Sequence, residues 1–215
     1  PARWQRRSPD QATSAAGSSD YFEVALSDGG TVSGRRLVLA MGVTDTLPTI
    51  EGLAERWGRS VFHCPYCHGY ELDEGDIGVL ATGELSMHHA LMLPDWGRVT
   101  LFLNDAFTPD DAQYEALARR GVMIEATPVV RIDGEAEVVL RDGRRLPMTG
   151  LFVVPRTTVT GTLSQQLGCA MEAGPMGEFI ATDAMKATNV PGVFCCGDMA
   201  RAAGSVALAV ADGAI

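Results

Sequence analysis

Two cysteines separated by two residues lie in residues 63–70, which read HCPYCHGY. Cys64 and Cys67 are close enough to form a small disulfide that can open and close again. His68 directly follows the second cysteine and could move protons for the pair, because an imidazole titrates near neutral pH. Cysteine pairs with this spacing occur as redox dithiols, as zinc ligands and as attachment sites for c-type haem.

The rest of the chain disfavours haem and zinc. Haem is attached in exported compartments, and we expect no signal peptide because no basic and then apolar stretch opens the sequence. A structural zinc site usually draws on two ligand pairs separated by a loop. Cys195 and Cys196 are adjacent, so they form no such second pair. We therefore interpret Cys64 and Cys67 as a redox pair and expect no metal site; a purely structural role for both is the remaining alternative.

Composition narrows the class of protein. The chain has 215 residues, is 46% hydrophobic and carries a formal net charge of −10. Such an acidic chain repels phosphate backbones, so we expect no nucleic-acid partner. No apolar run approaches the roughly 18 residues of a membrane span. Five cysteines are too few for a disulfide-stapled secreted scaffold. We expect a cytoplasmic protein in which Cys169, Cys195 and Cys196 are buried by packing.

The first part of the chain predicts strands joined by a turn. Residues 1–20 are polar and show no clear period, whereas residues 22–26 alternate and are followed by the turn signal Asp-Gly-Gly at 28–30. The apolar run at 36–40 is the next strand. It meets Met41 and Gly42, where the missing side chain lets a backbone approach a ligand closely.

Strands alternate with helices after the cysteine motif, which predicts βαβ units and a parallel sheet. His88 and His89 lie on the first of these helices, and we expect both to be solvated. Thr108 and Pro109 are the expected N-cap and first residue of the second helix. The expected elements are strands over 77–81, 99–103, 121–126 and 151–155, helices over 85–93 and 110–120, and a meander over 129–146.

A strand over 192–196 ends in Gly197 and Asp198, and a helix of small residues follows from about 205 to 211. The aspartate could accept hydrogen bonds from the sugar-like hydroxyls of a cofactor. The helix N-terminus could offer amides and partial positive charge to an electron-rich ring edge. Taken alone, a Gly-Asp pair is a weak signal, and an ordinary turn is the favoured explanation for it.

The order of these landmarks resembles the thioredoxin-reductase-like flavoproteins over about residues 21–215. The landmarks are the Leu-Ala-x-Gly turn at 39–42, the Cys-Pro-x-Cys motif and the sequence TNVPGVFCCGD at 188–198. Residues 64–71, CPYCHGYE, resemble the branch that contains the gliotoxin and holomycin dithiol oxidases and the depsipeptide disulfide-forming enzyme. Thioredoxin reductases proper carry an aspartate at the position of His68.

The resemblance implies an α/β fold with two Rossmann-like, three-layer domains, in which the FAD domain is split by an inserted central domain. We expect residues 1–60 and 156–215 to form the two parts of the FAD-binding domain. Residues 61–155 are expected to form a central NAD(P)-binding-like domain that carries the cysteine pair. The resemblance also implies a homodimer.

The resemblance assigns roles to individual residues. Cys64 would face the substrate and form a mixed disulfide, and Cys67 would face the flavin. His68 would act as the base for the incoming thiol and the acid for the leaving one. For His63, packing and catalysis are both open. The residues assigned to FAD are Ala40, Met41, Gly42, Gly197, Asp198, Ser205, Val206 and Ala207.

Two departures from the family pattern matter. The strand–GxGxxG–helix unit that holds the FAD pyrophosphate is missing, so we expect a truncated or partly observed chain without its first βαβ unit. The nicotinamide turn reads ATGELS at 81–86: Ala81 replaces its first glycine, and Glu84 brings negative charge. No arginine cluster follows the next strand at 103–107. NAD(P)H binding is therefore doubtful, and we expect a relic central domain.

Together these inferences predict a FAD-dependent dithiol oxidase. A small-molecule or peptide dithiol would leave as a disulfide, and oxygen would take the electrons and yield hydrogen peroxide. The alternative is a NAD(P)H-dependent disulfide reductase that acts on a thioredoxin-like protein. A redox-inactive flavin-binding or scaffold protein is the non-enzymatic alternative.

Overall fold

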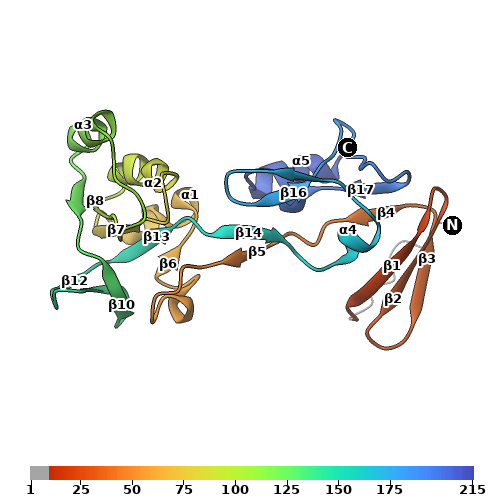
Figure 1. The fold of residues 1–215 in the computed structure, drawn as a ribbon, viewed down its shortest axis with the longest axis horizontal. Helices are drawn as coiled ribbons and strands as arrows, with labels where there is room; N and C mark the ends of the chain where they lie inside the picture. The colour runs from red at the N-terminus through yellow and green to blue at the C-terminus, as the bar shows by residue number, and fades with distance from the viewer. Residues whose placement is uncertain (1–9) are drawn as a thin grey trace. The chain divides into compact units, whose positions relative to one another are not determined.

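A computed structural model describes residues 10–215 and divides the chain into two compact units (Figure 1). The split unit comprises the residues up to Asp45 together with Thr157–Ile215, and the inserted unit comprises Thr46–Arg156. The chain passes between the units in β5 (Val43–Thr46) and β14 (Arg156–Val159), which pair with each other.

The first boundary lies after residue 45, whereas the sequence suggested one after residue 60. Residues 46–60 carry the short 3₁₀ helix η1 (Ala54–Arg56) and belong to the inserted unit. Leu53 is fully buried in the core of this unit, and Ile50 and Trp57 pack against the same core. The segment looks like a linker in the sequence because its apolar residues are spaced irregularly around Pro48 and Gly52.

The inserted unit is built on a five-stranded parallel sheet, as the alternation of strands and helices predicted. Its order is β6-β13-β7-β8-β9, and every neighbouring pair is parallel. The strands are β6 (Val61–Phe62), β7 (Asp76–Leu80), β8 (Arg98–Phe102), β9 (Met123–Glu125) and β13 (Gly150–Val153).

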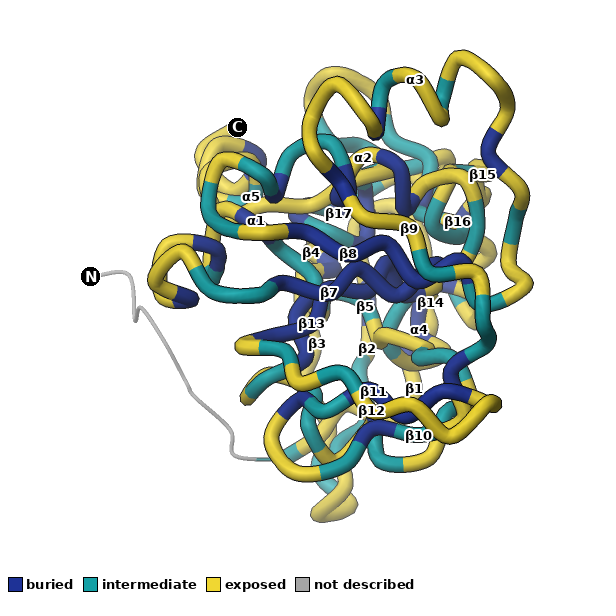
Figure 2. The backbone as a smooth tube through the Cα atoms, turned by 90° about the vertical axis from the view of Figure 1, so that its left-hand side faces the viewer, coloured by how far each residue is buried: buried dark blue, intermediate teal, exposed yellow. Residues whose placement is uncertain are grey.

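Both faces of this sheet are covered, which explains the nearly continuous apolar runs of its central strands. One face packs against α2 (Ser86–Met92), η3 (Leu93–Asp95) and α3 (Asp111–Arg119). The other packs against the meander that the sequence predicted. Figure 2 shows the buried strands β7 and β8 between these two coverings. The meander consists of β10 (Val129–Asp133), β11 (Glu137–Leu140) and β12 (Arg145–Pro147).

The split unit contains short sheets around a core that includes Phe22, Leu39, Ile180 and Met199. β4 (Leu37–Leu39) pairs in parallel with β17 (Val193–Cys195), so residues far apart in the sequence end side by side. The other strands are β1 (Ala12–Ser18), β2 (Tyr21–Leu26), β3 (Thr31–Gly34), β15 (Met171–Ala173) and β16 (Glu178–Ile180). The helices are α4 (Leu163–Gln166), η4 (Gly197–Ala200) and α5 (Val206–Gly213).

One strand was not predicted, and one local prediction is wrong. The polar stretch over 1–20 includes strand β1, which lacks a hydrophobic alternation because Ala15 is its only buried residue; residues 1–9 lie outside the described part. Helix α3 is capped by Asp110 rather than Thr108. The Asp110 carboxylate accepts a hydrogen bond from the Gln113 amide at 2.8 Å, and the Gln113 side chain accepts one from the Asp110 amide at 2.9 Å. This reciprocal capping box satisfies two helix-end amides.

Within residues 10–215, no helix is long and apolar enough to cross a membrane.

Candidate active site and cofactor pocket

The cysteine pair lies at the start of α1 (Pro65–His68), directly after β6. Cys64 is the N-cap residue with an extended backbone, and Pro65 occupies the first helical position, where its missing N–H is not needed. The Cys67 amide donates to the Cys64 carbonyl at 3.1 Å, which closes the first turn. Gly69 is required behind it, because a Cβ there would lie 2.7 Å from the Pro65 carbonyl oxygen and 2.9 Å from the Trp96 ring.

Both thiols are reduced in this structure, with Cys64 half-buried and Cys67 exposed. The Cys67 thiol donates a hydrogen bond to Cys64; this contact, followed by burial and the nearby charge of Cys64, raises the pKa of Cys67 to about 11. The Cys67 thiol is therefore harder to deprotonate than an ordinary cysteine. The hydrogen bond to the neighbouring sulfur raises this pKa although Cys67 lies in the first turn of a helix, where the helix start lowers the pKa of a thiol.

His68 is held from two sides. Its ring stacks on Phe62 with the ring centroids 4.2 Å apart and an interplanar angle of 18°. Its Nδ1 atom lies 3.3 Å from the Glu71 carboxylate, one turn further along the chain in η2 (Tyr70–Leu72). A carboxylate on one ring nitrogen fixes the tautomer and leaves the other nitrogen for proton transfer. The Phe62 stack and the Glu71 contact together hold the His68 ring next in sequence to Cys67.

The prediction that His88 and His89 are both solvated is correct for His88 and wrong for His89. His89 is only 3% exposed, and its Nδ1 atom has no hydrogen-bond partner. Burial first, and then the positive charge that His63 and His88 can carry, lower the pKa of His89 to about 3. Its position could have been inferred from helical spacing, since Ser86, Ala90 and Leu93 on the same face are also buried.

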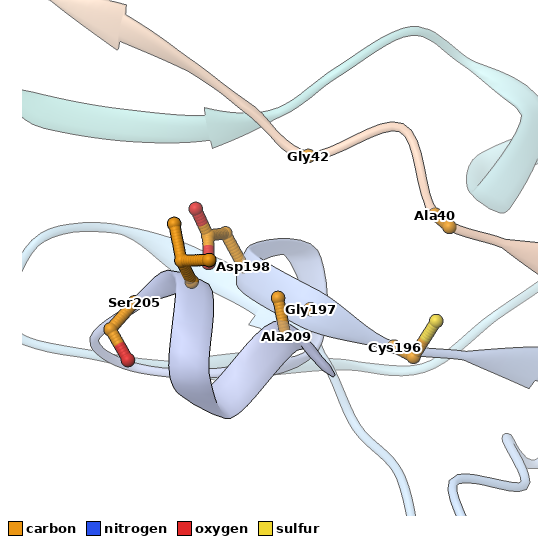
Figure 3. A pocket seen from close by; sticks show the side chains of 8 residues that line it. Ala40, Gly42, Cys196, Gly197, Asp198, Ser205 and Ala209 are labelled. Carbon is orange, nitrogen blue, oxygen red and sulfur yellow. The ribbon is translucent and has the colours of Figure 1, made fainter. Parts of the chain in front are cut away.

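A pocket of about 240 Å³ opens in the split unit where β4 and β17 end (Figure 3). It brings together six of the eight residues predicted to bind FAD, and adds Cys196 and Ala209. The lining residues are Ala40, Gly42, Cys196, Gly197, Asp198, Ser205, Val206 and Ala209. The ends of two parallel strands meet here, which is where open α/β sheets bind ligands.

Met41 and Ala207 do not line this pocket. The Met41 amide instead donates to the Met199 sulfur at 3.2 Å. Ala209 lines the pocket where the sequence predicted Ala207, because Ser205 and Ala209 are one helical turn apart and share a face of α5. Cys169 and Cys195 are buried as predicted, but Cys196 is half-buried. Side chains alternate along a strand, so Cys196 faces the pocket when Cys195 faces the core.

The residues of this pocket fit a cofactor with hydroxyl groups. Oδ1 of Asp198 is buried and unpartnered, so it can accept a hydrogen bond from a ligand. A Cβ on Gly204 would lie 2.1 Å from that oxygen, so the space beside it depends on glycine. Ser205 caps α5 by accepting from the Leu208 amide at 3.2 Å.

A buried carboxylate holds the Gly197–Asp198 turn in place. Asp212 of α5 accepts hydrogen bonds from the Gly197 amide at 3.2 Å and from Nε of Arg201 at 2.8 Å, and it lies 3.1 Å from Nζ of Lys186. The Arg201 guanidinium, assisted by Lys186, holds the pKa of Asp212 well below its usual range. Asp212 has no signal in the sequence, because its partners come from two segments outside its own helix, one at Lys186 and one at Gly197 and Arg201.

The turn after β7 is closed by its own side chains. The Thr82 amide donates to Oγ of Ser86 at 3.0 Å, and the Thr82 hydroxyl donates to the Val154 carbonyl at 2.9 Å. A phosphate at this turn would have to displace those bonds. The sequence predicted no arginine cluster after β8; one arginine, Arg141, lies 3.8 Å from the Asp105 carboxylate. Arg141 comes from the meander, so the local sequence around Asp105 could not reveal it.

The strand order, the cysteine turn and the Gly-Asp pocket are those of a known family. The family model for pyridine nucleotide-disulphide oxidoreductases matches residues 10–213, and the chain belongs to this family. Its relatives are thioredoxin-reductase-like, and the cofactor that the family implies is FAD.

Two curated relatives are similar to this chain over most of its length. The chain is 33% identical to thioredoxin reductase sirT of Leptosphaeria maculans, over 94% of this chain and 67% of that protein. It is 32% identical to thioredoxin reductase tcpT of Claviceps purpurea, over 84% of this chain and 59% of that protein. The chain thus spans about two thirds or less of the length of these relatives.

Two solved structures share the fold closely. An oxidoreductase from Agrobacterium tumefaciens is 55% identical, with a TM-score of 0.92 over 95% of this chain and 70% of that one. HlmI is 36% identical, with a TM-score of 0.82 over 97% of this chain and 66% of that one. Among residues 10–215, no group of three or more histidine, cysteine or acidic side chains could hold a metal ion.

Proposed function

We propose that the full-length protein is a FAD-dependent dithiol oxidase, which closes a disulfide in a small-molecule or peptide dithiol and passes the electrons to oxygen. The observation that carries this proposal is the Cys64–Cys67 pair with its shared proton and the fixed imidazole of His68. The family supplies the cofactor class, and the proposed division of labour is an FAD-binding split unit and an inserted unit that carries the thiols. A cytoplasmic homodimer belongs to the same proposal.

In the proposed thiol chemistry, residues of this chain take part in each bond that forms or breaks and in each proton transfer. A substrate thiolate attacks Sγ of Cys64 in the oxidised pair; a new S–S bond forms, the Cys64–Cys67 bond breaks, and Cys67 leaves as the thiolate. The second substrate thiolate then attacks the substrate sulfur of that mixed disulfide and releases Cys64. His68 accepts the proton of an incoming thiol and returns it to a leaving sulfur. FAD, when bound, accepts the electron pair from the reduced cysteines and so restores their disulfide.

The surface around the pair supports a substrate with apolar parts. Tyr66 and Tyr70 flank Cys67 and His68 in the sequence and are 77% and 87% exposed. Tyr66 is held edge-on against Trp96, with the ring centroids 5.7 Å apart. Rigid, exposed aromatic rings offer a ligand large contact areas at a low cost in conformational entropy.

The observation that favours a NAD(P)H-dependent disulfide reductase is Arg141, a cation close to the end of β8. Against it stand the internally bonded Thr82 turn and the acidic Glu84. Arg141 is also paired with Asp105, which offsets the attraction that it would offer to a phosphate.

The test uses the FAD-loaded, full-length protein with a simple dithiol such as dithiothreitol. We expect oxygen uptake with release of peroxide, at a rate that added NADP⁺ does not change. Turnover that stops without oxygen and resumes with NADP⁺ would favour the reductase, as would oxidation of NADPH in the presence of a thioredoxin-like protein. If the full-length protein shows no flavin absorbance after reconstitution with FAD, both the oxidase and the reductase proposals fail.

A further inference from the structure

The turn at Gly197 and Asp198 forms part of the pocket in the split unit, and a residue outside the pocket holds its backbone. Gly197 adopts a φ of 73°, a left-handed conformation that suits glycine. The turn presents Asp198 beside Ala209 of α5 (Figure 3), and among residues 10–215 its buried Oδ1 atom has no hydrogen-bond partner. The Gly197 amide donates to Oδ2 of Asp212 at 3.2 Å. The position of the unpartnered oxygen in the pocket therefore depends on Asp212.

Asp212 is itself held at both of its carboxylate oxygens. Oδ2 also accepts from Nε of Arg201 at 2.8 Å, and Oδ1 accepts from Nη2 of the same guanidinium. Nζ of Lys186 lies 3.1 Å from Oδ1. Arg201 first, and Lys186 with it, hold the pKa of Asp212 below its usual range, so the carboxylate stays charged at neutral pH. These three side chains form an ion triad that is largely buried: 1% of Asp212, 16% of Lys186 and 27% of Arg201 are exposed.

The ion triad is an unfavourable choice if stability is its only role. Moving charges out of water costs free energy, and well-packed apolar side chains of similar volume often stabilise a protein as much or more. Lys186 adds a second cost, because its φ of 62° is a left-handed conformation that favours glycine or asparagine. Asp183 fixes this conformation, since its carboxylate accepts from the Met185 and Ala187 amides, both at 2.9 Å. A lysine in this turn therefore indicates that its amine is needed.

We propose that the residues of the ion triad are positioning residues for FAD: they hold the turn that presents Asp198 to the cofactor. Lys186 keeps its left-handed conformation because its amine fixes Oδ1 of Asp212. Without that amine, Arg201 alone compensates the buried carboxylate, which can then turn away from the Gly197 amide and release the turn. This inference rests on the proposed assignment of FAD to the split unit, but not on the identity of the dithiol or of the electron acceptor.

The experiment measures the dissociation constant of FAD from the full-length protein. The apoprotein is titrated with FAD and binding is followed by the quenching of flavin fluorescence, while thermal unfolding of each apoprotein reports its stability. Lys186→Asn removes the charge and tolerates the left-handed backbone, so it is expected to fold. Lys186→Arg keeps the charge and is the conservative variant. Ser19→Gly is the matched backbone control, because Ser19 also has a positive φ, of 56°, and lies outside the pocket.

We expect Lys186→Asn to raise the dissociation constant of FAD roughly tenfold. Its apoprotein should unfold close to the temperature of the parent, because the lost ion pair and the relieved backbone strain offset each other. Lys186→Arg should bind FAD nearly as tightly as the parent, and Ser19→Gly should match the parent. The proposal is overturned if Lys186→Asn binds FAD as tightly as the parent. It is also overturned if Phe22→Leu, which only lowers the stability of the core of this unit, weakens FAD binding to the same extent.

Asp198→Ala separates this inference from the assignment on which it rests. It removes the unpartnered carboxylate and should weaken FAD binding at least as much as Lys186→Asn. If Asp198→Ala weakens binding and Lys186→Asn does not, the pocket binds FAD but the ion triad does not position it. If neither variant changes the dissociation constant, FAD binds elsewhere, and both the assignment and the inference fail. The titration involves no turnover, so a failure of the oxidase proposal leaves this test unaffected.

Discussion

Phe62 connects the core of the inserted unit to His68, the residue proposed to transfer protons, so Phe62→Leu tests how the fold supports the site. Phe62 is 7% exposed and contacts two rings, His68 at 4.2 Å and Phe152 at 5.8 Å. Ring pairs contribute about 0.5–1.5 kcal/mol each beyond the area that they bury. Losing both predicts a decrease of about 1–3 kcal/mol in the free energy of unfolding. Because domains have about 5–15 kcal/mol of stability, the variant is expected to fold.

The same change should reduce turnover. Without the stack, His68 is held only by its 3.3 Å contact with Glu71, whose side chain is 70% exposed. Exposed ion pairs contribute about 0–1 kcal/mol, which is too little to keep the imidazole in one orientation. General acid–base catalysis contributes about 10²–10⁴-fold, and a partial loss of orientation predicts a decrease of roughly tenfold in kcat.

Urea unfolding and oxygen uptake with a dithiol measure the two effects on the full-length protein. Phe102→Leu is the matched control, because Phe102 is fully buried in the cluster on the other face of the sheet. It should lose stability and keep the parent kcat. If Phe62→Leu is destabilised but turns over dithiol at the parent rate, the stack on His68 is a packing contact and the reasoning fails.

Three further predictions concern the thiols, the pocket and pH. Cys64→Ser replaces the thiol that accepts the Cys67 hydrogen bond by a hydroxyl, which can donate a stronger hydrogen bond to a Cys67 thiolate. A Cys67 thiolate should then appear at neutral pH as long-wavelength absorbance in the FAD-loaded protein; the same band in Cys67→Ser instead would reverse the two roles. Gly204→Val should lower the FAD content, because even a Cβ there would lie 2.1 Å from Asp198, and a flavin-to-protein ratio equal to that of the parent would contradict this. His89 binds a proton in the unfolded chain below about pH 6.5 but in the folded chain only near pH 3, so stability should fall as the pH drops between these values. His89→Leu should flatten this dependence in urea titrations at several pH values, and an unchanged slope would count against it.

The sequence predicted the elements whose signals are local. The apolar runs around Ile77 and Val99 became neighbouring parallel strands, and the helix expected from about residue 205 is found as α5, for which Ser205 is the N-cap. Strand periodicity and capping chemistry act over a few residues, so they can be inferred without knowing the partner. β1 escaped detection because its register comes from backbone pairing with β2 and requires almost no buried side chain.

The composition of the site was predictable, but its electrostatics were not. Cys64, Cys67 and His68 are evident from their spacing. The sequence could not show that a hydrogen bond to Cys64 raises the pKa of Cys67, that His89 is buried beside His63, or that Asp212 holds the Gly197 turn. Burial and pKa depend on groups that the chain brings together from distant segments. The amino-acid sequence by itself therefore determined which chemistry is available to this protein, and the tertiary structure alone decided which atoms carry its protons.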